Sequence, residues 1–247
     1  MEVEPCRPAG TEPSSAVAGG RADDPGTPLP EPVVELNSGP PTRPRPAATV
    51  MLLRGGTRRL ELLLVRRNPG ARFMGGAWVF PGGAVDRTDG DGRRALRAAA
   101  VRELHEEAGI ALAPEAELVA YARWITPPEV RMRFDTWSYL TPAPADIEPS
   151  VDGKEIVDWG WWRPPDALAS YAAGTMALAF PTVKQLQQLS VFPSATALLE
   201  HARATEVVAM EPRVLLGGET ARIVLPGEPE WEPPDGTAEG EPPRGSG

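Results

Sequence analysis

Three glutamates within five consecutive residues, Glu103, Glu106 and Glu107, form the most distinctive chemical pattern in the chain. On a helix with 3.6 residues per turn, this spacing confines the three carboxylates to an arc of roughly 100° on one face. Like charges four residues apart destabilise a helix. A hard divalent cation removes that penalty, because Mg²⁺ and Mn²⁺ prefer carboxylate oxygens. For three glutamates taken alone, a solvated acidic face is the competing explanation.

The element that carries these glutamates is a helix predicted over residues 93–108, which are rich in Ala, Leu, Arg and Glu. Asp91 is placed to cap its first turn, and Gly109 stands where a glycine commonly ends a helix. The face away from the glutamates is apolar and should pack on a core; it consists of Ala100, Val101, Leu104 and Ala108.

A glycine pair, Gly82 and Gly83, lies between a predicted strand at residues 77–80 and this helix. Glycines let the backbone approach a ligand closely and adopt positive φ. The chain is acidic, with a net charge of -9, so the positive charge that neutralises a bound phosphate must come from a cation. Carboxylate-bound Mg²⁺ keeps positions for phosphate oxygens and lowers the pKa of a bound water. The pattern therefore predicts a site for a metal-bound diphosphate.

Composition limits the remaining function classes. The negative net charge gives no electrostatic basis for binding nucleic acid or an anionic membrane. No apolar run approaches the ~18 residues that cross a bilayer, and the N-terminus lacks the pattern of a signal peptide. The single cysteine, Cys6, excludes a disulfide within the chain, which fits a reducing compartment. We expect a cytoplasmic protein.

The chain is predicted to hold one α+β domain at residues 47–228, between disordered Pro-rich and Gly-rich tails at 1–46 and 229–247. Strands and helices intermix without regular alternation. The predicted strands span residues 48–53, 60–65, 77–80, 118–125, 134–140 and 156–162, with a last hairpin at 207–216 and 221–225. Besides the helix at 93–108, helices are predicted at residues 166–173, 182–189 and 195–204.

Residues 102–110 resemble the signature of the Nudix hydrolases, Gly-x5-Glu-x7-Arg-Glu-U-x-Glu-Glu-x-Gly-U, where U is aliphatic. The second half of the signature matches at every fixed position, which are Arg102, Glu103, Leu104, Glu106, Glu107, Gly109 and Ile110.

The first half of the signature departs from the family pattern. Counted back from Arg102, its glutamate falls on Arg94 and its glycine on Thr88, whereas Gly83 lies five residues earlier. The chain therefore carries a longer loop before the helix. A substitute carboxylate could come from this loop, although turns and a helix cap are the more frequent use of such residues; the candidates are Asp86, Asp89 and Asp91.

The resemblance implies a Nudix fold, in which a mixed sheet is sandwiched between helices, here with additional C-terminal helices and a hairpin. It implies hydrolysis of a nucleoside diphosphate linked to another moiety. It also implies that Glu103, Glu106 and Glu107 bind Mg²⁺ or Mn²⁺ and that Arg102 orients them. For the general base, Glu155 is the first candidate and Glu129 the second, although a solvated loop residue is the more frequent explanation of each.

Three less specific stretches resemble the branch of the family that cleaves coenzyme A and acyl-CoA. They are Phe80-Pro81-Gly82-Gly83, Trp124-Ile125-Thr126-Pro127 with Arg133-Phe134-Asp135-Thr136, and Phe180-Pro181-Thr182. Coenzyme A would be cut at its diphosphate into 3′,5′-ADP and 4′-phosphopantetheine.

Arg131 and Arg133 could then bind the 3′-phosphate, because a guanidinium fork suits phosphate, although a charged hairpin end explains them as well. Tryptophans could stack on adenine, but core packing is their more frequent use; the four candidates are Trp124, Trp137, Trp161 and Trp162.

Two further kinds of function stay open at this point. The substrate could instead be a nucleotide sugar, ADP-ribose or NAD(H), or the domain could bind a nucleotide without catalysis. In each case the partner is a small nucleotidic molecule. The resemblance also leaves a homodimer open, with the late helices as its interface.

Overall fold

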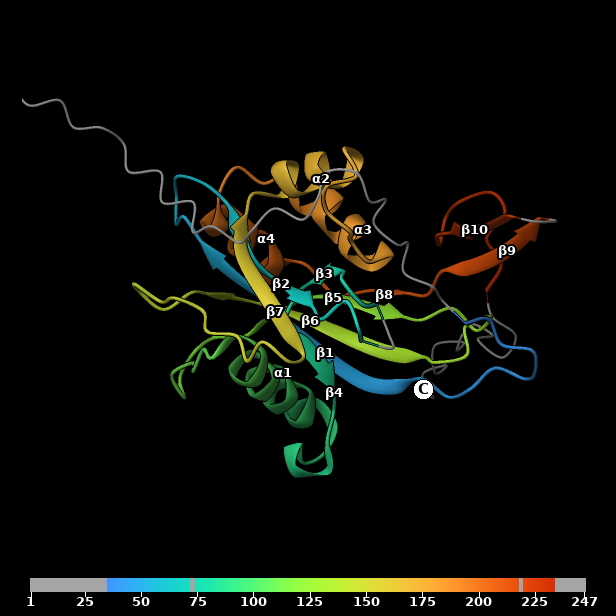
Figure 1. The fold of residues 1–247 in the computed structure, drawn as a ribbon, viewed down its shortest axis with the longest axis horizontal. Helices are drawn as coiled ribbons and strands as arrows, with labels where there is room; N and C mark the ends of the chain where they lie inside the picture. Colours follow the sequence, from blue (N-terminus) through green and yellow to red (C-terminus); the bar gives the residue numbers. More distant parts are fainter. Residues whose placement is uncertain (1–34, 72–73, 218–219, 234–247) are drawn as a thin grey trace, which may run out of the picture.

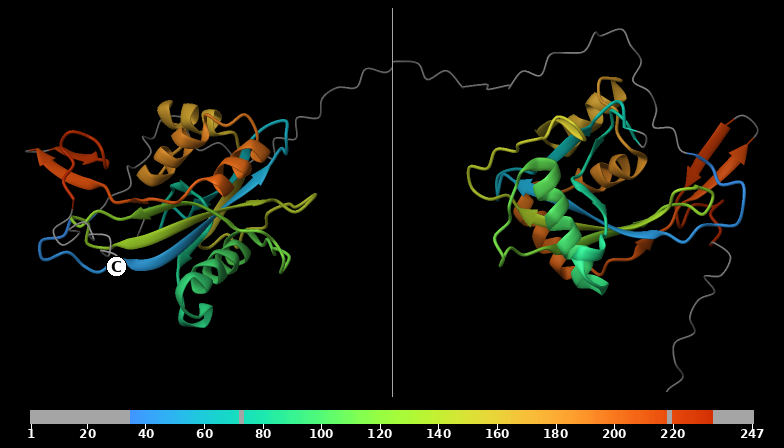
Figure 2. Two further views of the ribbon diagram at one scale, coloured as in Figure 1. Left: turned by 180° about the vertical axis from the view of Figure 1, so that it is seen from behind. Right: turned by 60° about the horizontal axis from the view of Figure 1, so that its bottom comes forward.

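A mixed eight-stranded sheet, covered by α1 on one face and by α2, α3 and α4 on the other, forms the body of the protein (Figure 1, Figure 2). The computed structural model describes residues 35–71, 74–217 and 220–233. The predicted sandwich of a mixed sheet between helices is confirmed. Most of the two predicted tails, residues 1–34 and 234–247, lies outside the described residues.

The sheet opens between its two first strands. Strands β1 (Arg45–Arg54) and β2 (Glu61–Arg67) pair only near their shared turn, at Leu53↔Leu62 and the next pair. Beyond that point β3 (Trp78–Val79) pairs with β2, and β4 (Gly82–Ala84) pairs with β1. The segment that carries the glycine pair therefore crosses the opening of the sheet.

The other strands extend the sheet on both sides. Next to β1 come β6 (Phe134–Pro142, parallel to β1), β5 (Val119–Ile125, antiparallel to β6) and β8 (Ala209–Met210, parallel to β5). On the outer side of β2 lies β7 (Ile156–Trp162, antiparallel). A separate two-stranded hairpin follows, formed by β9 (Arg213–Gly217) and β10 (Thr220–Val224).

The helices begin and end close to their predicted positions. They are α1 (Gly92–Ala108), α2 (Pro164–Ala172), α3 (Phe180–Leu189) and α4 (Ala195–Ala204), preceded by a short 3-10 helix, η1 (Arg87–Asp89). Gly109 ends α1 in the left-handed conformation, with φ of 67°, and donates its N–H to the carbonyl of His105. Asp91 occupies the cap position of α1, but its side chain makes no capping hydrogen bond.

Alternation along β1 divides the core into two halves. Val50 and Leu52 pack toward α1, whereas Met51 and Leu53 pack toward the three other helices. This follows from the period of two in a strand, which places successive side chains on opposite faces. Small alanines of α1, among them Ala99, Ala100 and Ala108, are fully buried and let that helix lie close to the sheet. No helix in the described part of the chain is long and apolar enough to cross a membrane.

Two predicted boundaries need correction. Strand β1 begins at Arg45, and earlier residues are already held, because Asn37 donates its N–H to the carbonyl of Glu129. The expectation of disorder up to residue 46 is therefore wrong for residues 35–46. At the other end, the indole N–H of Trp231 donates to the carbonyl of Glu211, 2.9 Å away, so residues just past 228 also contact the domain.

The last predicted hairpin is confirmed as β9 and β10, but its first part behaves differently. Residues 209–210 leave the hairpin and join the main sheet as β8, next to β5. Pairing with a strand far away in sequence cannot be read from local periodicity, which explains the difference.

Candidate active site

The glycine pair on β4 makes room for two carboxylates. A side chain on Gly82 would lie 2.3 Å from the backbone oxygen of Ala48 on β1, and Gly82 has a φ of 155° that other residues rarely adopt. A side chain on Gly83 would lie 2.4 Å from the carboxylate of Glu103. The N–H of Gly82 donates to Oε2 of Glu107 at 2.9 Å. Glu103 and Glu107 therefore rest directly against this backbone segment.

Glu107 is the most deeply buried carboxylate of the group, with 5% of its surface exposed. Burial, and to a lesser degree the negative charges of Glu103 and Glu155, raises its pKa to about 8. The hydrogen bond from Gly82 and the charge of Arg67 offset only part of this increase. Burial also raises the pKa of Glu103, against the effect of Arg102. The site thus gathers negative charge in a poorly solvated place.

Arg102 links the glutamates to the loop before the helix. Its Nη1 donates to Glu103 at 2.8 Å and to Glu106 at 2.9 Å. Its Nη2 and Nε donate to the two carboxylate oxygens of Asp89, at 3.0 and 3.1 Å, and Nη2 also reaches the carbonyl of Ala84. These contacts raise the pKa of Arg102 and lower that of Asp89. They are the contacts that the predicted orienting role of Arg102 requires.

Asp89 supplies the carboxylate that appeared to be missing from the first half of the signature. Its side chain is 4% exposed and faces Arg102, whereas Arg94 is exposed on the first turn of α1. Counted forward from Gly83, the spacing Gly-x5-Glu falls on Asp89, so the added residues lie between Asp89 and Arg102. Counting back from Arg102 concealed this match, and counting from the glycine could have found it.

The other two loop aspartates have local roles. Asp86 caps η1, with its carboxylate accepting from the N–H of Thr88, and Asp89 accepts in turn from the N–H of Asp86. Asp91 occupies the cap position of α1. The capping box fixes the backbone of the loop and so the place of Asp89.

Glu155, the first candidate for the general base, lies next to the glutamates of α1. Arg67, the last residue of β2, donates from Nη2 to Glu155 at 3.1 Å, and its Nη1 lies 3.9 Å from Oε1 of Glu107. Glu155 is otherwise exposed, at 62%. Sequence reasoning did not find Arg67, because the end of a buried strand carries no motif of its own.

Glu129, the second candidate, is placed elsewhere. Its carboxylate accepts from Nε of Arg213 at 2.6 Å and from the N–H of Val214 at 3.1 Å. It therefore holds the C-terminal hairpin against the loop before β6.

The three glutamates of α1 are not drawn together as a metal cluster. Among the described residues, no three His, Cys, Asp or Glu side chains gather closely enough to hold a metal ion. Glu103 and Glu106 instead contact Arg102, and Glu107 contacts Gly82 and Arg67. The donor set still suits a hard cation, because it consists of carboxylates, one of them desolvated among like charges. Binding one would require these carboxylates to turn away from the two arginines.

The predicted 3′-phosphate site is not formed as expected. Arg133 is 7% exposed and donates to Glu211 at 2.6 Å and to the carbonyls of Thr126 and Thr42. This packing argues against the prediction that it binds phosphate, since its donors already hold the protein together. Arg131 is exposed and pairs with Glu35 at 3.1 Å.

The four tryptophans serve mainly in packing. Trp124 is buried and packs edge-to-face against Phe180. The guanidinium groups of Arg93 and Arg123 stack over the indole of Trp137, 5.7 and 5.5 Å from the ring centroid. Because they are adjacent in a strand, Trp161 and Trp162 point to opposite faces, Trp161 toward the half of the core that contains α1.

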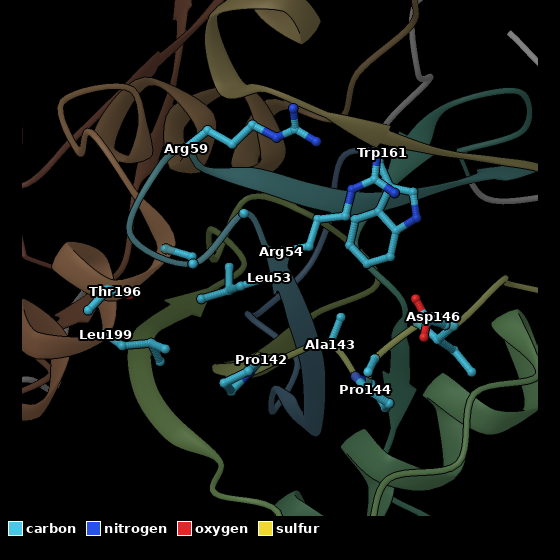
Figure 3. Close-up of a pocket in the computed structure, with 15 residues that line it drawn as sticks. Leu53, Arg54, Arg59, Pro142, Ala143, Pro144, Asp146, Trp161, Thr196 and Leu199 are labelled. Carbon is cyan, nitrogen blue, oxygen red and sulfur yellow. The ribbon is translucent and has the colours of Figure 1, made fainter. Parts of the chain in front are cut away.

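A cavity of about 610 Å³ lies at the far end of β1, away from the carboxylates. Its walls include Leu53, Pro142 and Leu199, and the guanidinium of Arg54 stacks on the indole of Trp161 at 4.6 Å (Figure 3). None of the residues around it belongs to the glutamate site. We therefore locate the candidate chemistry at the carboxylates and not in this cavity.

Comparisons with known proteins agree with the resemblance seen in the sequence. The family model described as NUDIX domain matches residues 43–182. A Caenorhabditis elegans protein named "Putative nudix hydrolase 7" is 28% identical over 220 residues, covering 74% of this chain and 73% of that protein. The crystal structure of a NUDIX hydrolase from Alicyclobacillus acidocaldarius matches with a TM-score of 0.57 and 27% identity, covering 66% of this chain and 97% of that one.

Proposed function

The chain belongs to the Nudix hydrolase family, and from this premise we propose that it cleaves the diphosphate of coenzyme A or acyl-CoA with the help of Mg²⁺ or Mn²⁺. Members of this family act on nucleoside diphosphates linked to another moiety and generally use divalent metal ions. The enzyme class thus follows from membership, while the particular substrate and metal are our proposal.

One observation carries the proposal for the site: the carboxylates of Glu103 and Glu107 rest on the backbone of Gly82 and Gly83. A glycine backbone leaves no side chain between a bound diphosphate and the carboxylates. Arg102 is held by Asp89 and donates hydrogen bonds to Glu103 and Glu106, which restrains these two carboxylates. This arrangement supports a role in positioning a cation next to a diphosphate.

In the proposed reaction, Glu103, Glu106 and Glu107 would hold the divalent cation. When bound, the cation would neutralise the diphosphate oxygens and lower the pKa of a water. A carboxylate oxygen of Glu155 would accept the proton of the attacking water, from a position next to Arg67. The water oxygen bonds to one phosphorus, the bond from that phosphorus to the bridging oxygen breaks, and the other phosphate leaves.

The choice of coenzyme A rests on the resemblance of the three stretches around Phe80, Trp124 and Phe180. The packing of Arg133 removes one argument for it, because that side chain is not available to a 3′-phosphate. Nucleotide sugars, ADP-ribose and NAD(H) are therefore the rival substrates. A domain that binds a nucleotide without catalysis is disfavoured, since the family match is to hydrolases. Cytoplasmic location and a homodimer stay predictions.

A substrate panel tests the proposal directly. Purified protein is incubated with coenzyme A, acetyl-CoA, ADP-ribose, NADH or UDP-glucose, with Mg²⁺, with Mn²⁺ or with a chelator. We expect metal-dependent release of 3′,5′-ADP and 4′-phosphopantetheine from coenzyme A, at the highest kcat/KM of the panel. A higher kcat/KM for another compound would replace coenzyme A with that substrate. If no compound is cleaved with either metal, the proposed reaction is wrong.

A further inference from the structure

Arg67 reaches the carboxylates because of its place at the end of β2. Val65 and Leu63 lie two and four residues earlier and pack in the half of the core that contains α1. By the alternation of a strand, Arg67 projects from the same face. There the apolar packing ends, and the guanidinium enters the opening of the sheet next to Glu107 and Glu155.

The guanidinium of Arg67 uses few of its donors. Its Nη2 donates to Glu155 at 3.1 Å, but the 3.9 Å from Nη1 to Glu107 is too long for a hydrogen bond. Its Nε is buried and has no hydrogen-bond partner among the described residues. A buried donor without a partner costs stability, so a side chain held this way is expected to have a second use.

Charge balance indicates what that use is. Arg67 is the cation beside Glu107 and Glu155, and Arg102 serves Glu103 and Glu106 in the same way. A divalent cation among the carboxylates would hold Glu107 in its ionised form and would supply the positive charge beside it in place of Arg67. Arg67 would then have its planar fork of donors free at the edge of the site, in a form that matches phosphate oxygens.

We propose that Arg67 is a substrate-binding residue that pairs with Glu107 and Glu155 in the free protein and binds the diphosphate once a divalent cation occupies the carboxylates. This inference rests on the proposed function, because it assumes a diphosphate at this site. It assigns Arg67 a role in binding the substrate, and it makes the metal and the arginine alternate partners of Glu107.

The test compares Arg67→Gln and Arg67→Lys with the control Arg58→Gln, which replaces an exposed arginine in the turn between β1 and β2. Mn²⁺ binding to the substrate-free proteins is measured by electron paramagnetic resonance. The affinity for ADP is measured by calorimetry at saturating Mn²⁺. Circular dichroism and thermal melting verify that each variant is folded.

For Arg67→Gln we expect Mn²⁺ binding at least as tight as in the wild type, because a competing cation is gone. We expect the affinity for ADP to fall by ~10–100-fold, the usual effect of losing hydrogen bonds to a charged group. The affinity of Arg67→Lys for ADP should lie between those of the wild type and Arg67→Gln, since lysine keeps the positive charge but lacks the planar fork of donors. In turnover, KM should rise more than kcat falls.

An unchanged affinity for ADP in Arg67→Gln overturns the inference. So does Mn²⁺ binding weakened tenfold or more, which would show that Arg67 supports the metal site instead of competing with the metal. If Arg67→Gln does not fold, Arg67→Lys decides by the same two measurements. Mn²⁺ binding and ADP affinity can both be measured without turnover. If the wild type cleaves no compound in the panel, the proposed reaction is refuted, but the ADP affinities still test the role of Arg67.

Discussion

At the scale of single residues, the burial of Glu107 has a direct consequence for stability. Its folded pKa of about 8 lies above the ordinary value of 4.5, so the folded protein favours the protonated carboxyl. The contribution of such a group to the free energy of unfolding is fully present below pH 4.5 and is lost as pH rises toward 8. Without a divalent cation, the protein should therefore carry a penalty at Glu107 that grows between these two values.

Glu107→Gln should remove this penalty, because the amide resembles the protonated carboxyl. In a chelator we expect the free energy of unfolding of the variant to exceed that of the wild type by on the order of 2–4 kcal/mol at pH 8. At pH 5 the two proteins should differ little. Urea unfolding at both pH values measures the difference. If the free energies of unfolding of the two proteins differ by the same amount at pH 5 and at pH 8, the raised pKa of Glu107 is contradicted.

Asp89 offers a second test at this scale. Asp89→Asn keeps the size of the side chain but removes the charge that faces Arg102, so Arg102 should hold Glu103 and Glu106 less firmly. We expect kcat/KM to fall by ~10–100-fold, the effect of losing a charge-assisted hydrogen-bond pair. Asp146→Asn, at an exposed position with φ of 54° that asparagine tolerates, is the matched control. Wild-type kcat/KM in Asp89→Asn would leave Asp89 without the role assigned to it.

Sequence reasoning reached part of the site at this scale and missed another part. The glutamates, Arg102 and the glycine pair followed from spacing and motif. Arg67 did not, because its contact with Glu155 joins residues 88 positions apart and depends on which strands are neighbours. The packing of Arg133 could not be predicted for a related reason, since its partner Glu211 is 78 positions away. In a sequence, a charged side chain that stabilises the fold cannot be distinguished from one that binds a ligand until its partners in the fold are known.

At the scale of elements, strand β4 determines where the glutamates lie. Gly83→Ala should place a methyl group against the carboxylate of Glu103, which is flexible enough to move, so the fold should survive. Gly82→Ala would meet the backbone of β1, which cannot move as easily, and would add strain at a positive φ.

We therefore expect Gly83→Ala to lose activity by at least tenfold with a nearly unchanged melting temperature. Gly82→Ala should lose at least ~2 kcal/mol of stability. Gly39→Ala, where the added methyl group meets only an asparagine side chain at 3.9 Å, is the control. Kinetics together with thermal unfolding separates the two effects. A Gly83→Ala enzyme with full activity would mean that Glu103 does not need its observed position.

Local elements were predicted well because they rest on local signals. The end of α1 at Ala108 follows from Gly109, and α4 begins and ends at the predicted residues. The opening of the sheet between β1 and β2 was not foreseen, since strands as short as β3 and β4 leave no periodicity to detect. Their pairing partners are chosen by the tertiary fold.

At the scale of the whole molecule, arginine side chains connect the C-terminal hairpin and the segment before β1 to the main sheet through ion pairs and a hydrogen bond. Arg133 joins Glu211 and the carbonyl of Thr42, and Arg213 joins Glu129. In Figure 1 the hairpin β9–β10 projects from one end of the sheet, beside the blue segment that leads into β1. The loop before β6 thus ties together parts of the chain that are distant in sequence.

Arg133→Ala should consequently affect stability and not substrate affinity. Removing one partner of a buried ion pair leaves Glu211 without its charge partner, and we expect a loss of about 3 kcal/mol. The KM for coenzyme A, or for whichever panel compound is cleaved, should stay within about twofold of wild type, because the side chain of Arg133 is occupied by protein partners. A twofold change corresponds to less than about 0.5 kcal/mol. Arg131→Ala, at the exposed neighbour, should change neither quantity appreciably. A large rise in KM with unchanged stability would restore the phosphate-binding role that the packing of Arg133 argues against.

In the proposed function, the carboxylates on α1 perform metal-dependent hydrolysis of a diphosphate. The most direct test measures kcat of wild type and Glu107→Gln on the best substrate of the panel, at saturating Mg²⁺. We predict that the variant stays folded and that its kcat falls by at least ~10³-fold, since a metal-supplied stabilisation of several kcal/mol is lost. Turnover by Glu107→Gln at the wild-type rate would contradict a role of these carboxylates in the hydrolysis.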